Sequence, residues 1–557
     1  MKKFSRINTK VVLSAILTAT MLMTSACSVS VNGIAEAVPA GQEAAAEETA
    51  ATAEAASEAQ EVFENSEDGG HAITADGETA EYSGIKVSKT GESQGDEADF
   101  YGENSAIFAT NGATLTIDNA DIETAGTHAN AVFSYGEGTT VNISDSNIET
   151  SGNCSGGLMT TGGGTMNAEN LTIHTTGNSS AAIRSDRGGG TVNVSGGTYT
   201  TDGKGSPAIY STADITVSDA ELTSTTSQGV VVEGKNSVAL ENVTLNADNN
   251  AKNSDKSDYF QAVMIYQSMS GDADEGTAGF SMEGGSLTNA NGDIFFVNNT
   301  RAVIDLKGAQ ITNNGDGVFL RAAAAGWGNE GSNGGHVDLN ADGQVIDGDM
   351  LVDEISTLNL YLKNGSDFNG AISGADASGD AGKAGEVYVE LDEGSKWTLT
   401  GDSYITSLTC GESSIDLNGH KLYVNGEEYK EGTASTGEAI KVEIQNTGRG
   451  NMPEPPGGGK GGPGGVSGNG IPGGKGGPGS ISGNGAPGGK GGFGGRQGGP
   501  QGGVSGNGIP GDKGGPGSIS GNGVPGGKGG FGDRQGGPQS GGRGGQGRPG
   551  QSNQFNK

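Results

Sequence analysis

A nine-residue pattern of apolar and polar positions recurs between about residues 81 and 430. It reads apolar, any, apolar, polar, then Asn, Asp or Gly, then small or apolar, any, apolar, any. Its clearest copies are LTIDNADIE from Leu115, VNISDSNIE from Val141, MNAENLTIH from Met166, VNVSGGTYT from Val192, ITVSDAELT from Ile215, VALENVTLN from Val238, FSMEGGSLT from Phe280, IDLKGAQIT from Ile304 and IDLNGHKLY from Ile415. The first five intervals are 26, 25, 26, 23 and 23 residues. Such a period is typical of a solenoid, in which each turn of the chain stacks on the one before.

Each copy predicts two short β-strands joined by a sharp turn. Apolar and polar residues alternate on either side of the fifth position, as they do in strands with one buried face. The fifth position is always Asn, Asp or Gly, the residues that best tolerate a positive φ. A third apolar run precedes several copies, and these runs are AIFA from Ala106, AVFS from Ala131, AAIR from Ala181, AIYS from Ala208 and VVVE from Val230.

Three strands in a turn of roughly 25 residues predict an all-β chain folded as a right-handed parallel β-helix over residues 81–430. Weaker copies near Leu360 and Val389 bring the helix to roughly 12 turns. The distribution of proline agrees, because 13 of the 15 prolines lie after residue 445. Stacked strands need their backbone N–H groups, which proline lacks.

The N-terminus predicts export. Four Lys and Arg residues precede a mostly apolar run, residues 11–26, which is short for a membrane span and is followed by Cys27. Residues 1–27 resemble a bacterial lipoprotein signal. That resemblance implies that Cys27 carries a lipid, which would anchor the exported chain in the cell membrane and expose it on the cell surface. The alternative is ordinary cleavage near the same position, which would release a secreted protein.

Two segments of biased composition flank the repeat. Residues 28–80 are rich in Ala, Glu and Thr without an apolar stripe, which predicts a disordered spacer. Residues 446–557 hold 49 Gly and 13 Pro in 112 residues and include a 38-residue repeat, which predicts a disordered tail. The tail has 11 basic and 3 acidic residues, whereas the whole chain has a net charge of −35. We therefore expect the tail to associate with anionic cell-wall polymer.

The composition argues against several classes of protein. A strongly acidic surface is a poor partner for nucleic acid, whose binding depends on Lys and Arg. Three cysteines are too few for a disulfide framework, and the five histidines stand at no metal-ligand spacing. The chain also lacks a phosphate-binding loop, a dinucleotide-binding motif and a Ser-His-Asp pattern.

The repeat region resembles secreted bacterial β-helix proteins of the pectate-lyase-like superfamily. More narrowly, it is similar to an adhesin-like group from Gram-positive gut bacteria. The segments that carry this likeness are DFYGENSAIFA, YQSMSGDADEGT, GWGNEGSNGGHVDLNAD and WTLTGDSYITSLT. The resemblance implies the fold and an exported location, but no established activity. Some members of the wider fold bind acidic plant polysaccharide with calcium, and others cleave it.

Three insertions interrupt the repeat at the same place, between the first and second strands of a turn. They are Gln267–Gly279, Arg321–Gly335 and roughly Gly374–Gly385. Because they fall on alternate turns, they should rise from one side of the helix and flank a shared groove. A fourth insertion, Ala247–Tyr259, lies at the neighbouring corner.

The middle insertion reads RAAAAGWGNEGSNGGH and suggests a carbohydrate contact. The indole face of Trp327 would stack on a sugar ring, and Arg321, Asn329 and His336 would orient the ligand. The alternative is that Trp327 packs onto the helix and anchors its loop.

Calcium is the one metal that the sequence suggests. Asp272, Asp274 and Glu275 bring three carboxylates together among glycines in the first insertion, and calcium prefers oxygen ligands. A solvated acidic turn is the competing interpretation.

Catalysis has a weaker signal. Residues Arg184, Asp186 and Arg187 resemble the superfamily's arginine motif but lack its proline, and pairing of the arginines with carboxylates such as Asp186 is the favoured interpretation. The favoured function is a non-catalytic surface protein that binds extracellular or cell-wall polysaccharide, with calcium assisting. A polysaccharide lyase or hydrolase and a purely structural surface protein are the alternatives.

Overall fold

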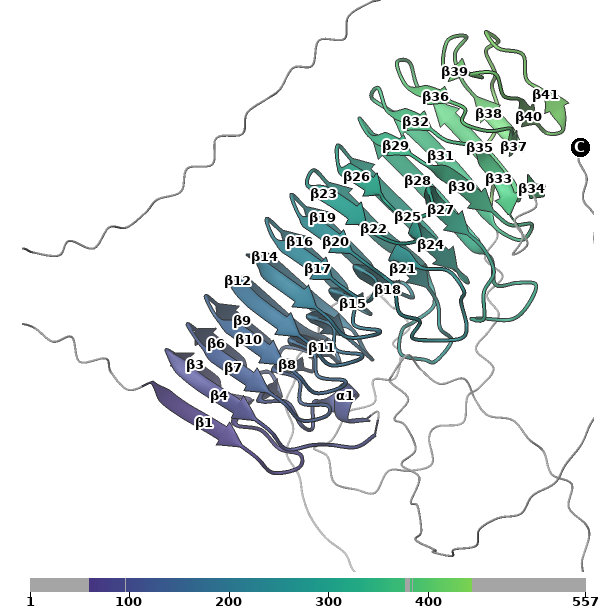
Figure 1. Cartoon of the computed structure of the whole chain (residues 1–557). Helices are drawn as coiled ribbons and strands as arrows, with labels where there is room; N and C mark the ends of the chain where they lie inside the picture. Colours follow the sequence, from purple (N-terminus) through teal and green to yellow (C-terminus); the bar gives the residue numbers. More distant parts are fainter. Residues whose placement is uncertain (1–59, 96, 376–380, 383, 443–557) are drawn as a thin grey trace, which may run out of the picture. The chain divides into compact units, whose positions relative to one another are not determined.

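The computed structural model describes residues 60–95, 97–375, 381–382 and 384–442. The predicted signal peptide, most of the spacer and the Gly-rich tail lie outside these residues. The described chain is nearly all β and confirms the parallel β-helix (Figure 1). Its helix α1 (Glu97–Tyr101) has five residues, and none of the described helices is long and apolar enough to span a bilayer.

Each turn of the helix contributes one strand to each of three parallel stacks. The first stack comprises β2 (Ile73–Asp76), β5 (Ile107–Thr110), β8 (Val132–Tyr135), β11 (Leu158–Thr161), β13 (Ile183–Ser185), β15 (Ile209–Ser211), β18 (Val230–Glu233), β21 (Gln261–Tyr266), β24 (Asp293–Asn298), β27 (Val318–Ala322), β30 (Asp349–Val352) and β33 (Ile372–Ala375), and β34 (Ala381–Gly382) pairs antiparallel with the last of them. The predicted third apolar runs all fall in this stack.

The second stack holds the first strand of most of the nine-residue copies. It comprises β3 (Thr79–Ser83), β6 (Thr114–Asp118), β9 (Thr140–Ser144), the first parts of β12 (Gly164–Thr175) and β14 (Gly190–Thr201), β16 (Asp214–Ser218), β19 (Ser237–Glu241), β22 (Thr277–Glu283), β25 (Thr300–Lys307), β28 (Gly335–Asp342), β31 (Thr357–Lys363), β35 (Glu386–Leu391) and β38 (Ser407–Thr409).

The third stack holds the second strand of most copies. It comprises β1 (Glu61–Asn65), β4 (Ile85–Lys89), β7 (Asp121–Thr124), β10 (Asn147–Thr150), the last parts of β12 and β14, β17 (Glu221–Ser224), β20 (Thr244–Ala247), β23 (Ser286–Asn289) and β26 (Gln310–Asn313), followed by a separate sheet of β29 (Val345–Asp347), β32 (Asp367–Asn369), β36 (Lys396–Thr398) and β39 (Ile415–Asp416). A small sheet of β37 (Ser403–Ile405), β40 (Leu422–Val424) and β41 (Glu427–Glu428) ends the described helix.

The core is a column of stacked apolar side chains that point inward from the three stacks. Strand register brings equivalent positions of successive turns together, and one such line in the second stack runs through Leu115, Val141, Met166, Val192, Ile215, Val238, Phe280, Ile304, Leu339, Leu360, Val389 and Leu408. All of these side chains are buried. Trp397 is fully buried in this column and stacks on Phe368.

The turn between the second and third stacks uses the predicted left-handed backbone. The fifth residue of every copy has a positive φ, namely Asn119, Asp145, Asn170, Gly196, Asp219, Asn242, Gly284, Gly308 and Gly419. Side chains also join neighbouring turns at this corner, because the Asn170 amide donates to the Asp145 carboxylate at 2.6 Å. Local sequence therefore dictates this corner directly.

Two boundaries differ from the prediction. Strands β1 and β2 and the start of β3 precede residue 81, so the described helix begins at Glu61, inside the expected spacer. The copy that starts at Ile415 also lies at another corner. Its strands are β39 and β40, which pair with β36 of the third-stack sheet and with β37, rather than with the second and third stacks. Alternation of side chains is the same in every strand, so it cannot tell one corner from the next.

The first stack differs from the others because its outer face is covered. Every residue of β11, β18, β21, β24 and β27 is buried. Side chains that point outward along this stack form one register line, Phe108, Phe133, Met159, Arg184, Tyr210, Val231, Met264, Phe296, Arg321 and Leu351. Helix α1 and the loops 248–260, 267–276 and 323–334 join strands beside this line. As predicted, the last two loops leave from one corner on alternate turns.

Candidate functional site

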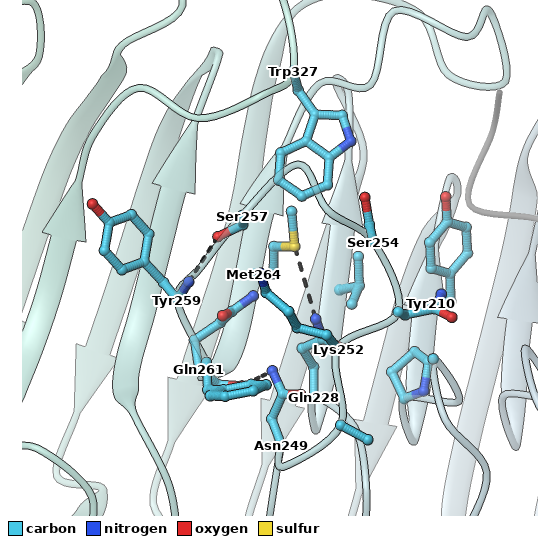
Figure 2. A pocket seen from close by; sticks show the side chains of 16 residues that line it. Tyr210, Gln228, Asn249, Lys252, Ser254, Ser257, Tyr259, Gln261, Met264 and Trp327 are labelled. Atoms are coloured by element: carbon cyan, nitrogen blue, oxygen red, sulfur yellow. Dashed lines mark hydrogen bonds between the residues drawn. The ribbon is translucent and has the colours of Figure 1, made fainter. Parts of the chain in front are cut away.

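A pocket lies on the outer face of the first stack, beneath loop 248–260 (Figure 2). Val231 and Met264 of the outward register line contribute apolar lining. The aromatic residues Tyr210, Tyr259, Phe260 and Trp327 also line the pocket. Its free volume is about 60 Å³, so it admits only a few small groups at a time.

Polar side chains line the same pocket. They are Gln228, Asn249, Lys252, Asn253, Ser254, Ser257 and Gln261. Gln261 is 1% exposed, and its Oε1 has no hydrogen-bond partner in the described part of the chain. Because a buried acceptor without a donor costs roughly 1–3 kcal/mol, this amide calls for an explanation.

Trp327 holds the position of a loop anchor. Its side chain is 4% exposed and packs edge-to-face on Tyr266 at 5.2 Å between ring centroids. It belongs to a cluster with Val231, Met264 and Phe296 on the outside of the first stack. The sequence left open whether Trp327 stacks on a ligand or packs on the helix; the geometry is that of packing, with one side bordering the pocket.

Arg321 is already engaged by the protein. Its Nε and Nη2 donate to the two oxygens of Asp293 at 2.6 and 3.1 Å, and its guanidinium lies 4.1 Å from the Tyr259 ring centroid. Burial raises the pKa of Asp293 to about 7, against the opposing effect of Arg321. The expected contact of Arg321 with a ligand carboxylate therefore competes with this pair.

The other residues predicted around Trp327 lie apart from the pocket lining. Asn329 is exposed in loop 323–334. His336 is in β28 of the second stack, where its Nδ1 lies 3.1 Å from the Thr357 hydroxyl. Burial, followed by the positive charge of Arg301, lowers the pKa of His336. Of the four predicted ligand contacts, Trp327 alone is among the residues that line this pocket.

The structure does not gather the predicted calcium ligands. Asp272 is buried and accepts from the Arg187 guanidinium at 2.9 Å and from the Ser270 hydroxyl at 2.7 Å. Asp274 is exposed and pairs with Lys235 at 2.9 Å, while Glu275 is exposed. These three carboxylates do not form a metal-binding group among the described residues.

Asp272 instead joins a buried polar network that holds loop 267–276. Ser270 links it to Ser268, and Ser268 donates to Glu233 of β18. Glu233 also accepts from the hydroxyls of Tyr210 at 2.5 Å and Tyr266 at 3.0 Å. Burial raises the pKa of Glu233, opposed by these hydrogen bonds. The sequence analysis missed this network, because its members come from four different turns.

A second buried cluster lies under α1. Arg184 donates to Asp186 at 2.8 Å, which confirms the predicted pairing, and also to Asp99 of α1 at 3.3 Å. Asp99 Oδ1 lies 2.9 Å from Nδ1 of His128. Burial raises the pKa of Asp186 to about 7 despite Arg184. Both guanidinium groups of the arginine motif are thus ion-paired, Arg184 here and Arg187 with Asp272.

Comparison of the chain with known protein families, with curated proteins and with solved structures finds no match. The fold and the geometry of the outer face are therefore the basis for a functional proposal.

Proposed function

We propose that this protein is a non-catalytic, exported β-helix that binds carbohydrate in the pocket under loop 248–260. The observation that carries the proposal is the buried amide of Gln261, whose Oε1 has no hydrogen-bond partner among the described residues, in a pocket lined by four aromatic residues. A sugar presents apolar C–H faces and hydroxyl donors side by side, and the pocket offers a complement to each. Because the free volume is about 60 Å³, a ring would rest on the rim while one substituent enters.

Two lysines favour an acidic sugar as the ligand. Lys252 lines the pocket, and Nζ of Lys256 lies 5.9 Å from the Trp327 ring centroid. They stand out on a chain whose net charge is −35. A uronic acid carboxylate at the rim would compete with Asp258 for Lys252, to which Asp258 is paired. In this proposal, calcium would bridge an acidic glycan to exposed carboxylates such as Glu275.

The proposal includes the location of the protein. Lipid attachment at Cys27 would anchor the chain in the membrane, and the Gly-rich basic tail would contact anionic wall polymer. Both rest on the sequence, because residues 1–59 and 443–557 lie outside the described part of the chain.

A glycan array probed with and without a calcium chelator tests the function. The change Gln261→Met then tests the pocket, because it removes the unpaired acceptor at nearly constant volume. Loss of one buried hydrogen bond to the ligand should weaken binding about 5- to 100-fold. The same change should leave the melting temperature unchanged or raise it, since it relieves an unsatisfied polar group.

Gln310→Met is the matched control, because Gln310 is exposed on the third stack, at the start of β26. It should bind as the unchanged protein does. Equal affinity of the Gln261 and Gln310 variants would remove the pocket from the proposal. Absence of any bound glycan on the array would remove the carbohydrate function itself, and release of reducing ends from a glycan would favour the enzyme alternative.

A further inference from the structure

His128 and Cys154 occupy the same corner on consecutive turns of the helix. Both have a left-handed backbone, with φ of 58° and 54°. The N–H of His128 donates to the carbonyl of Asn153 at 2.9 Å, and that of Cys154 donates to the carbonyl of Asn178 at 2.8 Å. The repeated bond pattern shows that the two corners stack in register. Residues 26 positions apart in sequence are therefore direct neighbours.

Helix α1 brings a carboxylate to this corner. Asp99 lies in the middle of α1, and one ligand atom each from Asp99, His128 and Cys154 lies within 4.8 Å of the other two. The three side chains are 1%, 8% and 5% exposed, so water has little access to them. The ligand atoms around a tetrahedral zinc ion lie about 3.4–3.6 Å apart, which is within this 4.8 Å limit.

We propose that Asp99, His128 and Cys154 form a binding site for a zinc-like divalent metal ion. A thiolate, an imidazole and a carboxylate are the three ligand types that zinc binds in proteins. The ion would take the place of the proton between His128 Nδ1 and Asp99. It would fasten the five-residue α1, which is too short to be stable by itself, onto the outer face of the first stack.

The charges around the corner fit such an ion. Asp99, Asp186 and a Cys154 thiolate would carry three negative charges in a buried volume. Arg184, which contacts both carboxylates, supplies one positive charge, and a divalent ion would supply the other two. Arg184 approaches Asp99 through Oδ2, whereas Oδ1 faces His128.

A further polar atom lies at the same corner. Ser179 is the equivalent residue on the turn after Cys154, with a φ of 55°, and its N–H continues the series of corner hydrogen bonds to the carbonyl of Lys204. Ser179 is 7% exposed, and its Oγ has no hydrogen-bond partner among the described residues. A hydroxyl in this place, directly or through water, completes the coordination of an ion held by three protein ligands.

The rival explanation is a cluster held by hydrogen bonds alone, in which His128 and Arg184 neutralise Asp99. The two explanations differ in the state of Cys154, which is a metal-bound thiolate in one and a buried thiol in the other. That difference has a spectroscopic signature, because cobalt bound by thiolate shows a charge-transfer band in the near ultraviolet.

The full chain with Cys27→Ser, dialysed against zinc and then freed of excess metal, should retain one zinc ion per molecule by elemental analysis. Replacing zinc by cobalt should produce the thiolate band. Cys154→Ser should abolish the band and lower zinc affinity at least 10-fold, and Asp99→Asn or His128→Gln should also lower it. Cys410→Ser, which removes the other buried cysteine of the described helix, is the matched control and should keep both signals.

Circular dichroism establishes that each variant retains its strand content. A chelator applied to the unchanged protein gives a test that needs no substitution, because removal of the ion should make α1 more susceptible to protease. Zinc retention that is the same in the Cys154 variant and in the control would overturn the proposal. A folded, zinc-exposed protein without bound zinc would overturn it equally.

Discussion

Replacing Trp327 by alanine distinguishes a packing residue from a ligand-stacking residue. The side chain is 4% exposed, so the substitution removes nearly a whole buried indole. Truncation of a buried Trp to Ala typically costs about 3–5 kcal/mol. The edge-to-face contact with Tyr266 belongs to the same loss and would by itself amount to about 0.5–1.5 kcal/mol.

The measured loss depends on what unfolds. Loop 323–334 is fastened by Trp327 and by Asn333, whose amide donates to the carbonyls of Ala325 and Trp327 at 2.6 and 2.8 Å. The loop can open while the β-helix stays folded. In that case Trp327→Ala can lower the free energy of global unfolding by no more than the free energy that holds the loop closed. Hydrogen exchange in the loop should then report the full 3–5 kcal/mol, while urea denaturation reports less.

Both measurements need a control within the same loop. Asn329→Ala is suitable because Asn329 is exposed, and it should change stability by less than about 0.5 kcal/mol. An unchanged melting temperature and unchanged loop exchange in Trp327→Ala, together with lost glycan binding, would refute the packing assignment. That result would mean that the indole turns toward the ligand in solution.

Two further predictions concern pH and anchoring. Burial raises the pKa of Asp293 to about 7 in the folded state, whereas an unfolded Asp loses its proton near pH 4. Between these two pH values the folded state holds a proton that the unfolded state has lost. The free energy of unfolding should therefore fall as the pH rises from about 4 to 7, by at most about 1.4 kcal/mol per pH unit. Urea denaturation at pH 5 and pH 7 should show a smaller difference in Asp293→Asn than in the unchanged protein, and an equal difference would contradict the assignment. Cys27→Ser should move the protein from the membrane fraction to the soluble fraction of its host cell, and unchanged partitioning would reject the lipid anchor.

The sequence alone determined the repeat and its corners. At Asn119, Asp145 and Asn170, a positive φ is a property of one residue and its immediate backbone, so the pattern predicted it correctly. The alternation of side chains likewise fixes which residues point inward, because the strand period is two. The copy at Ile415 lies at a different corner from the others, although its alternation of side chains is the same. The preceding turn of the helix, and not the alternation, decides at which corner a copy lies.

Tertiary structure decided what covers the first stack. Its strands are mostly apolar runs, such as VVVE from Val230, a pattern that is typical of strands buried on both faces. Which loop closes over a face depends on the path of a dozen or more residues, so the sequence left open whether Trp327 is buried.

The residues of the proposed metal site are also determined partly by the sequence and partly by the tertiary structure. His128 and Cys154 show no metal-ligand spacing along the chain, yet a separation of one helical turn makes them neighbours. The repeat could have indicated that pair. Asp99 lies one turn before His128, but α1 departs from the repeat, so the pattern does not say where its side chains lie.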